Sequence, residues 1–395
     1  MSFDFDQPID RENTGSLKFD ARRQLFGRED VIPLWVADMD FAVAEPISQA
    51  LQQRAAHPVY GYTVFPDELK SVMCDWFARR HQWTIEPDSI VWCPGVVPSL
   101  HASILALTEP GDPVIVQPPV YAPFFTSVTQ TKRQLMLNPL QQTASGDYQI
   151  DFDHLQQCAE AGAKCLVFCS PHNPVGRVWS RAELQQLLDW AEQYQITVIS
   201  DDIHADLVYP EFKHRPLATF ERPDVKLITA VSASKTFNIP GLGLSALVVD
   251  DAGQRRAINR VFDSWHVSAA NPFSITAFNA AYQHGDDWLD ALMDYLRQTR
   301  DWVMEFAADN CPQIQVIPAE GTYLLWLDCR QLGLKDAELK RFFVEQAGIG
   351  MNQGKMFGDV GRGFMRMNVA CPRAIVEQAW QLIARAVHAR HSKII

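Results

Sequence analysis

A lysine at the end of an apolar run is the residue in this sequence best suited to covalent chemistry. The stretch AVSASKTFNIPGLGLSALVVDD, residues 230–251, places Lys235 just after Ser232 and Ser234. Apolar surroundings disfavour the charged ammonium form of a lysine side chain. A neutral amine at this position is suited to attack an aldehyde and to form a Schiff base with it.

The elements around this lysine alternate between strands and helices. From about Ser89 to Asp250, short apolar runs rich in β-branched residues alternate with helical patterns, which predicts an α/β domain with a mostly parallel sheet. A strand is expected at 164–169, followed by the loop SPHNPVGRVW and by a helix that Ser180 and Glu183 begin with a capping box. Further strands are expected at PVIVQPPVY, at ITVIS and at KLITAV, which leads into Lys235.

Three polar residues follow these strands. Ligands of open parallel sheets bind beyond the carboxyl ends of the strands, so the loops with Asn173, Asp201 and Lys235 are expected to meet there. Upstream, SIVWCPGVVPSLHASILAL predicts a strand, a turn and a helix, with free backbone N–H groups near Gly95. Such groups at a helix start form an anion site, although an ordinary tight turn is the simpler interpretation of this segment alone.

Pyridoxal phosphate is the common aldehyde cofactor held by a lysine in this way. Its site needs phosphate donors, a carboxylate that keeps the pyridine nitrogen protonated, a donor to the phenolic oxygen, a stacking ring and an arginine for the substrate carboxylate. The predicted phosphate donors are Gly95, Val96, Val97, Ser232 and Ser234. Asp201 is the predicted partner of the pyridine nitrogen, and Asn173 is the predicted donor to the phenolic oxygen. Tyr121 is the predicted stacking ring, and Arg366 is predicted to bind the substrate carboxylate. Lys235, Tyr121 and Asp201 are the predicted catalytic residues, and Asn173 and Tyr121 are also expected to contact the substrate.

Several motifs carry a family resemblance that spans nearly the whole chain. The ordered series SPHNPVG, ISDDIH and SASKTFNIPG resembles the fold-type I pyridoxal-phosphate enzymes related to aminotransferases. Within that class the chain is similar to the MalY/PatB group of carbon–sulfur β-lyases, also called cystathionine β-lyases. The similar segments are RENTGSLKFD at 11–20, VADMDF at 36–41, GYTVF at 61–65, EGTYLLWLD at 320–328 and GRGFMRMNVACPR at 361–373.

The resemblance implies a homodimer with shared active sites that eliminates a thiol from cystathionine or a related cysteine S-conjugate, as in methionine biosynthesis. It implies that Lys235 forms the Schiff base and moves the proton, and that Tyr62 reaches the cofactor phosphate of the neighbouring subunit. His204 stands where many aminotransferases carry tyrosine and the lyase group carries histidine. Gly243 stands where aminotransferases carry an arginine of the phosphate clamp, so part of that clamp must differ.

Other interpretations of these residues stay open. The same site residues serve an aminotransferase, which is the second candidate function. Taken singly, Lys235 fits a solvated strand end, Tyr62 a core or interface aromatic, and His204 a buried structural histidine. A metal hydrolase built on DDIHAD is disfavoured, because alternate residues of a strand face opposite sides and no second ligand cluster is evident. GLGLSA precedes a strand and is no dinucleotide fingerprint. A binding or regulatory protein without catalysis is disfavoured by the intact Lys235 and Asp201.

Composition narrows the class of protein. The 395 residues are 47% hydrophobic and carry a net charge of -12, which argues against nucleic acid or an anionic membrane as the main partner. Eight cysteines without a C-x-x-C pair indicate the reduced, buried thiols of a cytoplasmic protein and no zinc site, and the amino terminus shows no export signal. We expect a large cofactor-binding domain at 48–284 and a small α/β domain made of 1–47 and 285–395.

Overall fold

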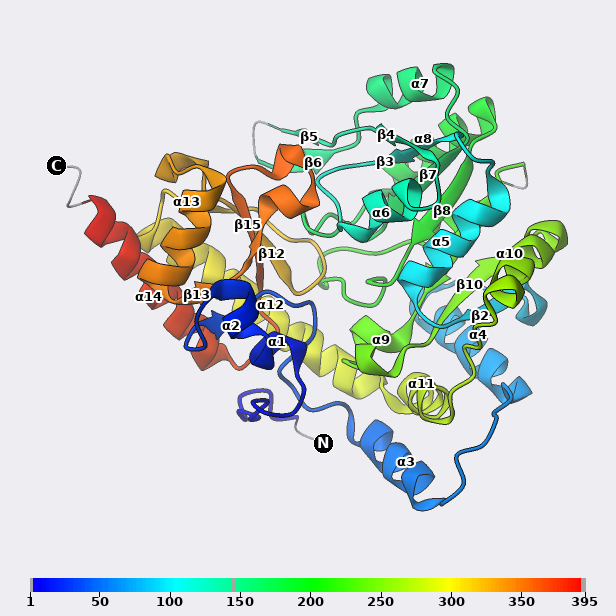
Figure 1. The fold of residues 1–395 in the computed structure, drawn as a ribbon, viewed down its shortest axis with the longest axis horizontal. Helices are drawn as coiled ribbons and strands as arrows, with labels where there is room; N and C mark the ends of the chain where they lie inside the picture. Colours follow the sequence, from blue (N-terminus) through cyan, green and yellow to red (C-terminus); the bar gives the residue numbers. More distant parts are fainter. Residues whose placement is uncertain (1–2, 144–145, 223, 392–395) are drawn as a thin grey trace.

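The computed structural model describes residues 3–143, 146–222 and 224–391, which contain a large and a small β-sheet lying side by side (Figure 1). The large sheet has seven strands in the order β2-β10-β9-β8-β7-β3-β4. They are β2 (Ile90–Cys93), β3 (Pro113–Val116), β4 (Gln134–Leu137), β7 (Cys165–Cys169), β8 (Thr197–Asp201), β9 (Leu227–Val231) and β10 (Ser245–Val249). β10 is antiparallel to both of its neighbours and the other pairs are parallel, which confirms the predicted mostly parallel sheet.

Both faces of the large sheet are covered by helices. Along β7, Leu166 and Phe168 pack in one buried cluster, whereas Val167 and Cys169 pack in another, because successive side chains of a strand point to opposite faces. The first cluster contains α7 (Phe152–Glu160) and α8 (Arg181–Tyr194), and the second contains α5 (Val96–Leu107), α6 (Pro123–Thr129) and α10 (Ala252–Trp265). α8 begins with the predicted capping box, which is worth about 1 kcal/mol to a helix start.

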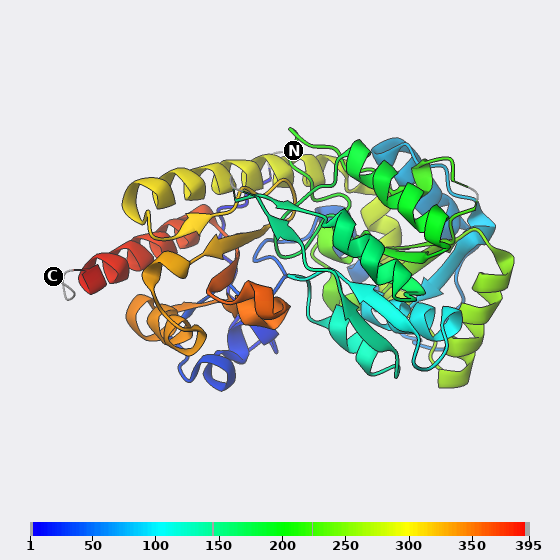
Figure 2. The same ribbon diagram turned by 90° about the horizontal axis from the view of Figure 1, so that it is seen from above.

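The small sheet is antiparallel, with β11 (Gln315–Val316), β12 (Leu324–Asp328), β15 (Phe364–Asn368) and β14 (Asn352–Gln353) in that order. Figure 2 shows α12 (Asp286–Asn310) and α14 (Arg373–His391) side by side next to it. Near the other chain end, β1 (Ile32–Pro33) pairs in parallel with β13 (Ile349–Gly350). Both chain ends therefore contribute to this part of the molecule, as the sequence predicts, while the domain boundaries themselves stay a prediction.

The remaining elements connect the two sheets or cover their edges. The helices are α1 (Leu17–Asp20), α2 (Arg22–Phe26), α3 (Glu45–Ala56), α4 (Asp67–His81), α9 (Ala233–Thr236), α11 (Pro272–His284) and α13 (Asp336–Arg341), which continues as a π-helical turn at Phe342–Ala347. β5 (Gln141–Gln142) and β6 (Tyr148–Gln149) form a small hairpin. Single 3-10 turns lie at Pro87–Ser89, Leu217–Thr219, Pro240–Leu242, Arg330–Leu332, Gly354–Phe357 and Asp359–Gly361.

Two of the expected elements are wrong in detail. The strand expected at PVIVQPPVY ends at Val116, because Pro118 and Pro119 have no N–H to donate to a sheet. Lys235 does not stand at the end of a strand: β9 ends at Val231, and the lysine lies in the single turn of α9. Ser232 begins this turn, since its hydroxyl accepts the N–H of Ser234.

The eight cysteines are all free, and seven of them are buried. In the part of the chain that the structure describes, no helix has both the length and the apolar character needed to cross a membrane.

Candidate active site

One pocket at the carboxyl ends of the large sheet brings the predicted site residues together. The parallel register places the end of β7 beside the end of β8 and β8 beside β9, so the segments that follow these strands converge. The cavity measures about 250 Å³. Its lining includes ten of the predicted residues: Gly95, Val96, Val97, Tyr121, Asn173, Asp201, His204, Ser232, Ser234 and Lys235.

The amine of Lys235 is held by a backbone carbonyl. Its Nζ donates a hydrogen bond of 2.7 Å to the carbonyl oxygen of Ala37, which lies 198 residues earlier in the chain. Burial lowers the pKa of Lys235 to about 8, and the positive charge of Arg366 acts in the same direction, while Asp38 and Asp201 oppose the shift. About a tenth of the amine is therefore neutral at pH 7, a far larger share than for an ordinary lysine, and the neutral form is the one that a nucleophile or a general base requires.

Asp201 is the last residue of β8 and is buried. Its Oδ1 accepts the backbone N–H of Ile203 at 3.1 Å, and Oδ2 has no hydrogen-bond donor among the described residues. Burial raises the pKa of Asp201 to about 7, and the neighbouring Asp202 adds to the rise. A buried carboxyl group with a free oxygen is suited to pair with a cationic ring nitrogen, which would restore its charged form.

Asn173 and Arg366 are linked across the two sheets. Arg366 lies on β15 and donates from Nη1 to Asn173 Oδ1 at 3.1 Å, so the Asn173 amide nitrogen points its hydrogens elsewhere and makes no hydrogen bond in the described chain. Nη2 donates to Trp35 O at 2.9 Å and to Asn352 Oδ1 at 2.7 Å. The buried Nε has no partner, and burial lowers the pKa of Arg366 to about 10. This arginine is fixed in place by three hydrogen bonds and keeps one buried donor without a partner.

The predicted anion site lies at the start of α5, whose N-cap residue is Gly95. The first N–H groups of an α-helix have no acceptor within the helix, and here they border the cavity through Val96 and Val97. Across the cavity, Ser232 donates its hydroxyl to Ser234 Oγ at 2.9 Å or to Leu244 O at 2.7 Å. These are the donor types that a phosphate group needs.

Gly243 also borders the cavity, and its backbone conformation explains the missing arginine of the phosphate clamp. Its φ is +45°, and a Cβ atom there would lie 3.2 Å from the carbonyl oxygen of Pro94. Residues with a side chain rarely adopt this conformation. An arginine at 243 would therefore be strained and tightly packed, so any phosphate bound here depends on the helix start and the serines.

Two further predicted residues border the cavity. The Tyr121 ring is partly exposed, and its backbone N–H donates to Asn173 O at 3.2 Å. His204 is buried, and its Nδ1 has no hydrogen-bond partner. Burial lowers the pKa of His204 to about 3, and Lys235 and Arg366 add to this effect, so the imidazole is neutral. Its two neighbours on the same segment do not form a metal cluster with it, since Asp202 binds His214 and Asp206 binds His81.

Arg366 does not line the pocket itself and meets it through its hydrogen bond to Asn173. Tyr62 is the other predicted site residue that lies outside the pocket. It is fully exposed, on a segment without regular secondary structure between α3 and α4. Sequence reasoning also missed several residues of the site. The most important are Ala37, whose carbonyl binds Lys235, and Tyr323, whose hydroxyl donates to the same carbonyl at 3.0 Å. Both lie in segments, VADMDF and EGTYLLWLD, that the family resemblance pointed to without a role for either residue.

The residues present fit a pyridoxal-phosphate group. A single cavity is bordered by four groups that such a cofactor needs. They are a lysine with a lowered pKa, a buried carboxyl group with a free oxygen, the amide nitrogen of Asn173, and a helix start with open N–H groups. No group of three or more residues suited to hold a metal ion occurs among the described histidines, cysteines, aspartates and glutamates.

Comparison with known proteins defines the class. The chain matches the family model "Aminotransferase class I and II" over residues 29–383. It is 37% identical to the cystathionine beta-lyase PatB of Bacillus subtilis over 385 residues, which covers 97% of this chain and 99% of PatB.

Two solved structures are similar over nearly their full length. A pyridoxal-phosphate-bound putative aminotransferase from Clostridium difficile has 36% identity and a TM-score of 0.96, and covers 98% of this chain and 100% of its own. Cystalysin from Treponema denticola, which contains pyridoxal 5'-phosphate, has 34% identity and a TM-score of 0.93 at the same coverage of both chains. The chain therefore belongs to the aminotransferase class I and II family and has its fold-type I architecture.

Proposed function

We propose that this chain is a pyridoxal-phosphate-dependent carbon–sulfur β-lyase. Its substrate is cystathionine or a related cysteine S-conjugate, which water and the enzyme convert to a thiol, pyruvate and ammonia. The observation that carries the proposal is the shared cavity of Lys235, Asp201 and Asn173, with Arg366 bonded to Asn173. The bound cofactor supplies an aldehyde that condenses with amino groups and a protonated ring that accepts electron density.

Each side chain of the cavity has a distinct task. The Lys235 amine would hold the cofactor's aldehyde and, as a neutral amine, would act as the base toward the substrate's α-proton. Asp201 keeps the proton on the ring nitrogen, and its own pKa falls when that cation is beside it. The Asn173 amide donates to the phenolic oxygen, and Tyr121 covers the ring. Arg366 binds the substrate carboxylate and so orients the α-proton toward Lys235.

The second candidate is an aminotransferase, which the name of the similar Clostridium difficile protein favours. The two functions differ in the fate of the substrate, since the lyase expels the thiolate from the β-carbon, whereas the aminotransferase hands the amino group to a keto acid. The similarity to PatB, over 97% of this chain, favours the lyase.

The test is the purified enzyme with cystathionine and no added keto acid. We expect pyruvate and a free thiol to appear in equal amounts over many turnovers. Amino-group transfer that occurs only after a keto acid is added would overturn the lyase assignment in favour of the aminotransferase.

A second test addresses the cofactor. In Lys235→Ala we expect no covalent cofactor after borohydride reduction, and peptide mapping of the reduced wild-type protein should find the label on Lys235. A label that persists in Lys235→Ala would place the attachment at another lysine.

We further propose that the protein acts in the cytoplasm as a homodimer, in methionine metabolism. What supports the dimer is the segment around Tyr62: Val59, Tyr60, Tyr62 and Val64 are all more than half exposed. Apolar side chains gathered in this way mark an interaction surface. In the dimer, Tyr62 of each subunit reaches the phosphate end of the other subunit's cavity.

A further inference from the structure

The carbonyl oxygen of Ala37 accepts two hydrogen bonds inside the site. Lys235 Nζ donates to it at 2.7 Å and the Tyr323 hydroxyl at 3.0 Å. A carbonyl oxygen has two lone pairs, so these two donors occupy both of its acceptor positions. Tyr323 and Lys235 thus share one acceptor, although they stand 88 positions apart in the sequence, with the whole of α12 between them.

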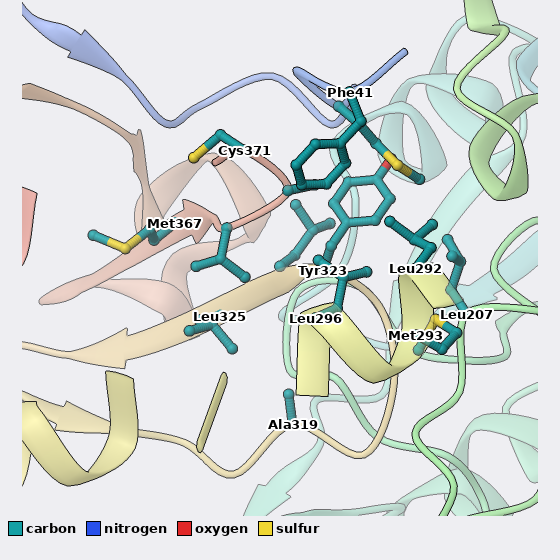
Figure 3. Close-up of a cluster of buried hydrophobic side chains, with 14 of the residues drawn as sticks. Phe41, Leu207, Leu292, Met293, Leu296, Ala319, Tyr323, Leu325, Met367 and Cys371 are labelled. Atoms are coloured by element: carbon teal, nitrogen blue, oxygen red, sulfur yellow. The ribbon is translucent and has the colours of Figure 1, made fainter. Parts of the chain in front are cut away.

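Packing alone does not explain why residue 323 is a tyrosine. Figure 3 shows its ring in a buried cluster, close to Phe41 and to Leu292 and Leu296 of α12. A phenylalanine ring would fill the same space. Two other fully buried tyrosines of the chain, Tyr209 and Tyr282, have hydroxyl groups without a hydrogen-bond partner. The Tyr323 hydroxyl differs from these two because it donates a hydrogen bond to Ala37 O, the same oxygen that holds Lys235.

The backbone before Tyr323 is shaped to direct it there. Thr322 has φ of +67°, a conformation that β-branched residues rarely adopt. Hydrogen bonds hold it: its N–H donates to Leu207 O, and its hydroxyl accepts the N–H of Leu324. Strain of this kind persists only where the surroundings enforce it, and it clusters at functional sites.

Tyr323 is not needed to hold the segment that carries Ala37. Asn368 donates from Nδ2 to Val36 O and, at 2.6 Å, to Asp38 O, one residue on each side of Ala37. Asn238 holds the same segment through the backbone N–H and the carbonyl of Met39. The position of the Ala37 carbonyl is therefore fixed by other residues, and the Tyr323 hydroxyl acts on the acceptor itself.

We infer that Tyr323 is a positioning residue for Lys235: by donating to Ala37 O, it leaves that oxygen a single direction in which to hold the lysine amine. This inference rests on the proposed function, in which the amine must be freed and act as a base. When an amine donates one hydrogen in a fixed direction, only two positions remain for its second hydrogen and its lone pair, and the Lys235 amine borders the cavity. The Tyr323 hydroxyl also draws electron density from the Ala37 oxygen, so this oxygen stabilises the ammonium form of Lys235 less strongly.

The other groups around Lys235 belong to different elements. Arg366 on β15 disfavours the ammonium form by its charge, whereas Asp201 on β8 and Asp38 on the segment of Ala37 favour it. His204 is neutral beside it. Tyr323→Phe keeps all of these side chains, and it keeps the ring that lies 6.3 Å from the His204 ring, so it removes the hydroxyl alone.

The test compares Tyr323→Phe with the wild type and with Tyr282→Phe, a matched control that loses a buried hydroxyl without a partner. Cofactor-free protein is labelled with acetic anhydride between pH 6 and 11, and the label on Lys235 is quantified by peptide mass spectrometry, with the exposed Lys132 as reference. In Tyr323→Phe the Ala37 carbonyl is a stronger acceptor for the ammonium group. We expect the labelling midpoint of Lys235 to rise by about half a pH unit. In Tyr282→Phe we expect the wild-type midpoint.

In the loaded enzyme we expect kcat of Tyr323→Phe to fall roughly three- to tenfold, with KM unchanged, because the base is misdirected while substrate binding is intact. An unchanged Lys235 midpoint in Tyr323→Phe, or an equal shift in Tyr282→Phe, would overturn the inference. The labelling arm needs no cofactor. If the cofactor failed to attach to Lys235, the proposed function would fall while the labelling result would still decide what Tyr323 does.

Discussion

Asp201 is buried at the end of β8 next to a second carboxylate, Asp202, and this arrangement lowers the folding stability of the cofactor-free chain at neutral pH. Burial raises the pKa of Asp201 to about 7. A carboxyl group in the unfolded chain has a pKa near 4. The folded chain therefore binds an extra proton between these values, and its stability falls as the pH rises from about 4 to about 7.

We expect Asp201→Asn to make the cofactor-free protein more stable by up to about 4 kcal/mol at pH 8 and by less than about 1 kcal/mol at pH 4.5, because the amide cannot ionise. Asparagine keeps an oxygen for the N–H of Ile203. Urea unfolding of both proteins at the two pH values measures the difference. The same variant should lose nearly all lyase activity, since an amide cannot keep the ring nitrogen protonated. Equal stability gains at both pH values would contradict the assignment of the effect to ionisation.

At the scale of elements, the turn that carries Lys235 depends on a buried carboxylate. α9 has four residues and is too short to be stable alone. Asp206 Oδ2 accepts the Thr236 hydroxyl at 2.8 Å, and Asp206 Oδ1 accepts His81 Nε2 at 2.6 Å and Trp76 Nε1 at 3.1 Å. These hydrogen bonds lower the pKa of Asp206 in spite of its burial. A lowered carboxylate pKa contributes stability that is present above about pH 4 and is lost as the pH falls further.

Asp206→Asn is expected to lose about 2–3 kcal/mol of unfolding free energy at pH 7, because a buried charged acceptor of three donors is replaced by a neutral group. The deficit should shrink below about pH 4, where the wild-type carboxylate is protonated on unfolding. Asp189→Asn is the control, since Asp189 pairs with Arg222 on the surface; we expect a loss below about 1 kcal/mol there. Chemical denaturation from pH 3 to 8 tests this, and a deficit that stays constant with pH would contradict it.

The side chains of the site could be predicted from the sequence, whereas the backbone groups that hold them in place could not. Asn173 and Asp201 follow apolar strands, and parallel strands bring their carboxyl ends together, so their convergence was predictable. Lys235 was predicted as a residue, but its position on a helical turn was not, because Ser232 begins that turn through a local hydrogen bond. The carbonyl of Ala37 leaves no mark in the sequence, since every residue has a carbonyl and only the fold brings this one to the amine.

At the scale of the whole molecule, the amino-terminal arm ties the two sheets together at the site. The fully buried Lys18 binds Asp40 at 2.8 Å, and Arg11 binds Asp38 and Asp40. These ion pairs hold the segment whose Ala37 carbonyl contacts Lys235 after β9 and Tyr323 before β12. The lysine of the large sheet and the tyrosine of the small one are thus positioned against the same short piece of chain.

One predicted site residue, Tyr62, does not line the cavity of its own chain, and in the proposed dimer its role depends on a second copy. A mixing experiment tests the proposed dimer with shared sites. Lys235→Ala and Tyr62→Ala are expected to be inactive or nearly so when each is prepared alone. In a mixed dimer, the site with an intact Lys235 would receive Tyr62 from the other subunit, so unfolding and refolding the two variants together at equal amounts should restore roughly a quarter of the wild-type sites.

The matched control for this experiment mixes Lys235→Ala with Asp201→Ala. Both residues line the same cavity of one chain, so every site of such a mixed dimer lacks one of them and no activity should return. Activity restored in the Tyr62 mixture and absent from the control would assign Tyr62 to the neighbouring subunit's site. Full activity of Tyr62→Ala by itself, or no recovery in its mixture, would contradict the shared site. Within its own chain, the exposed Tyr62 does not line the cavity.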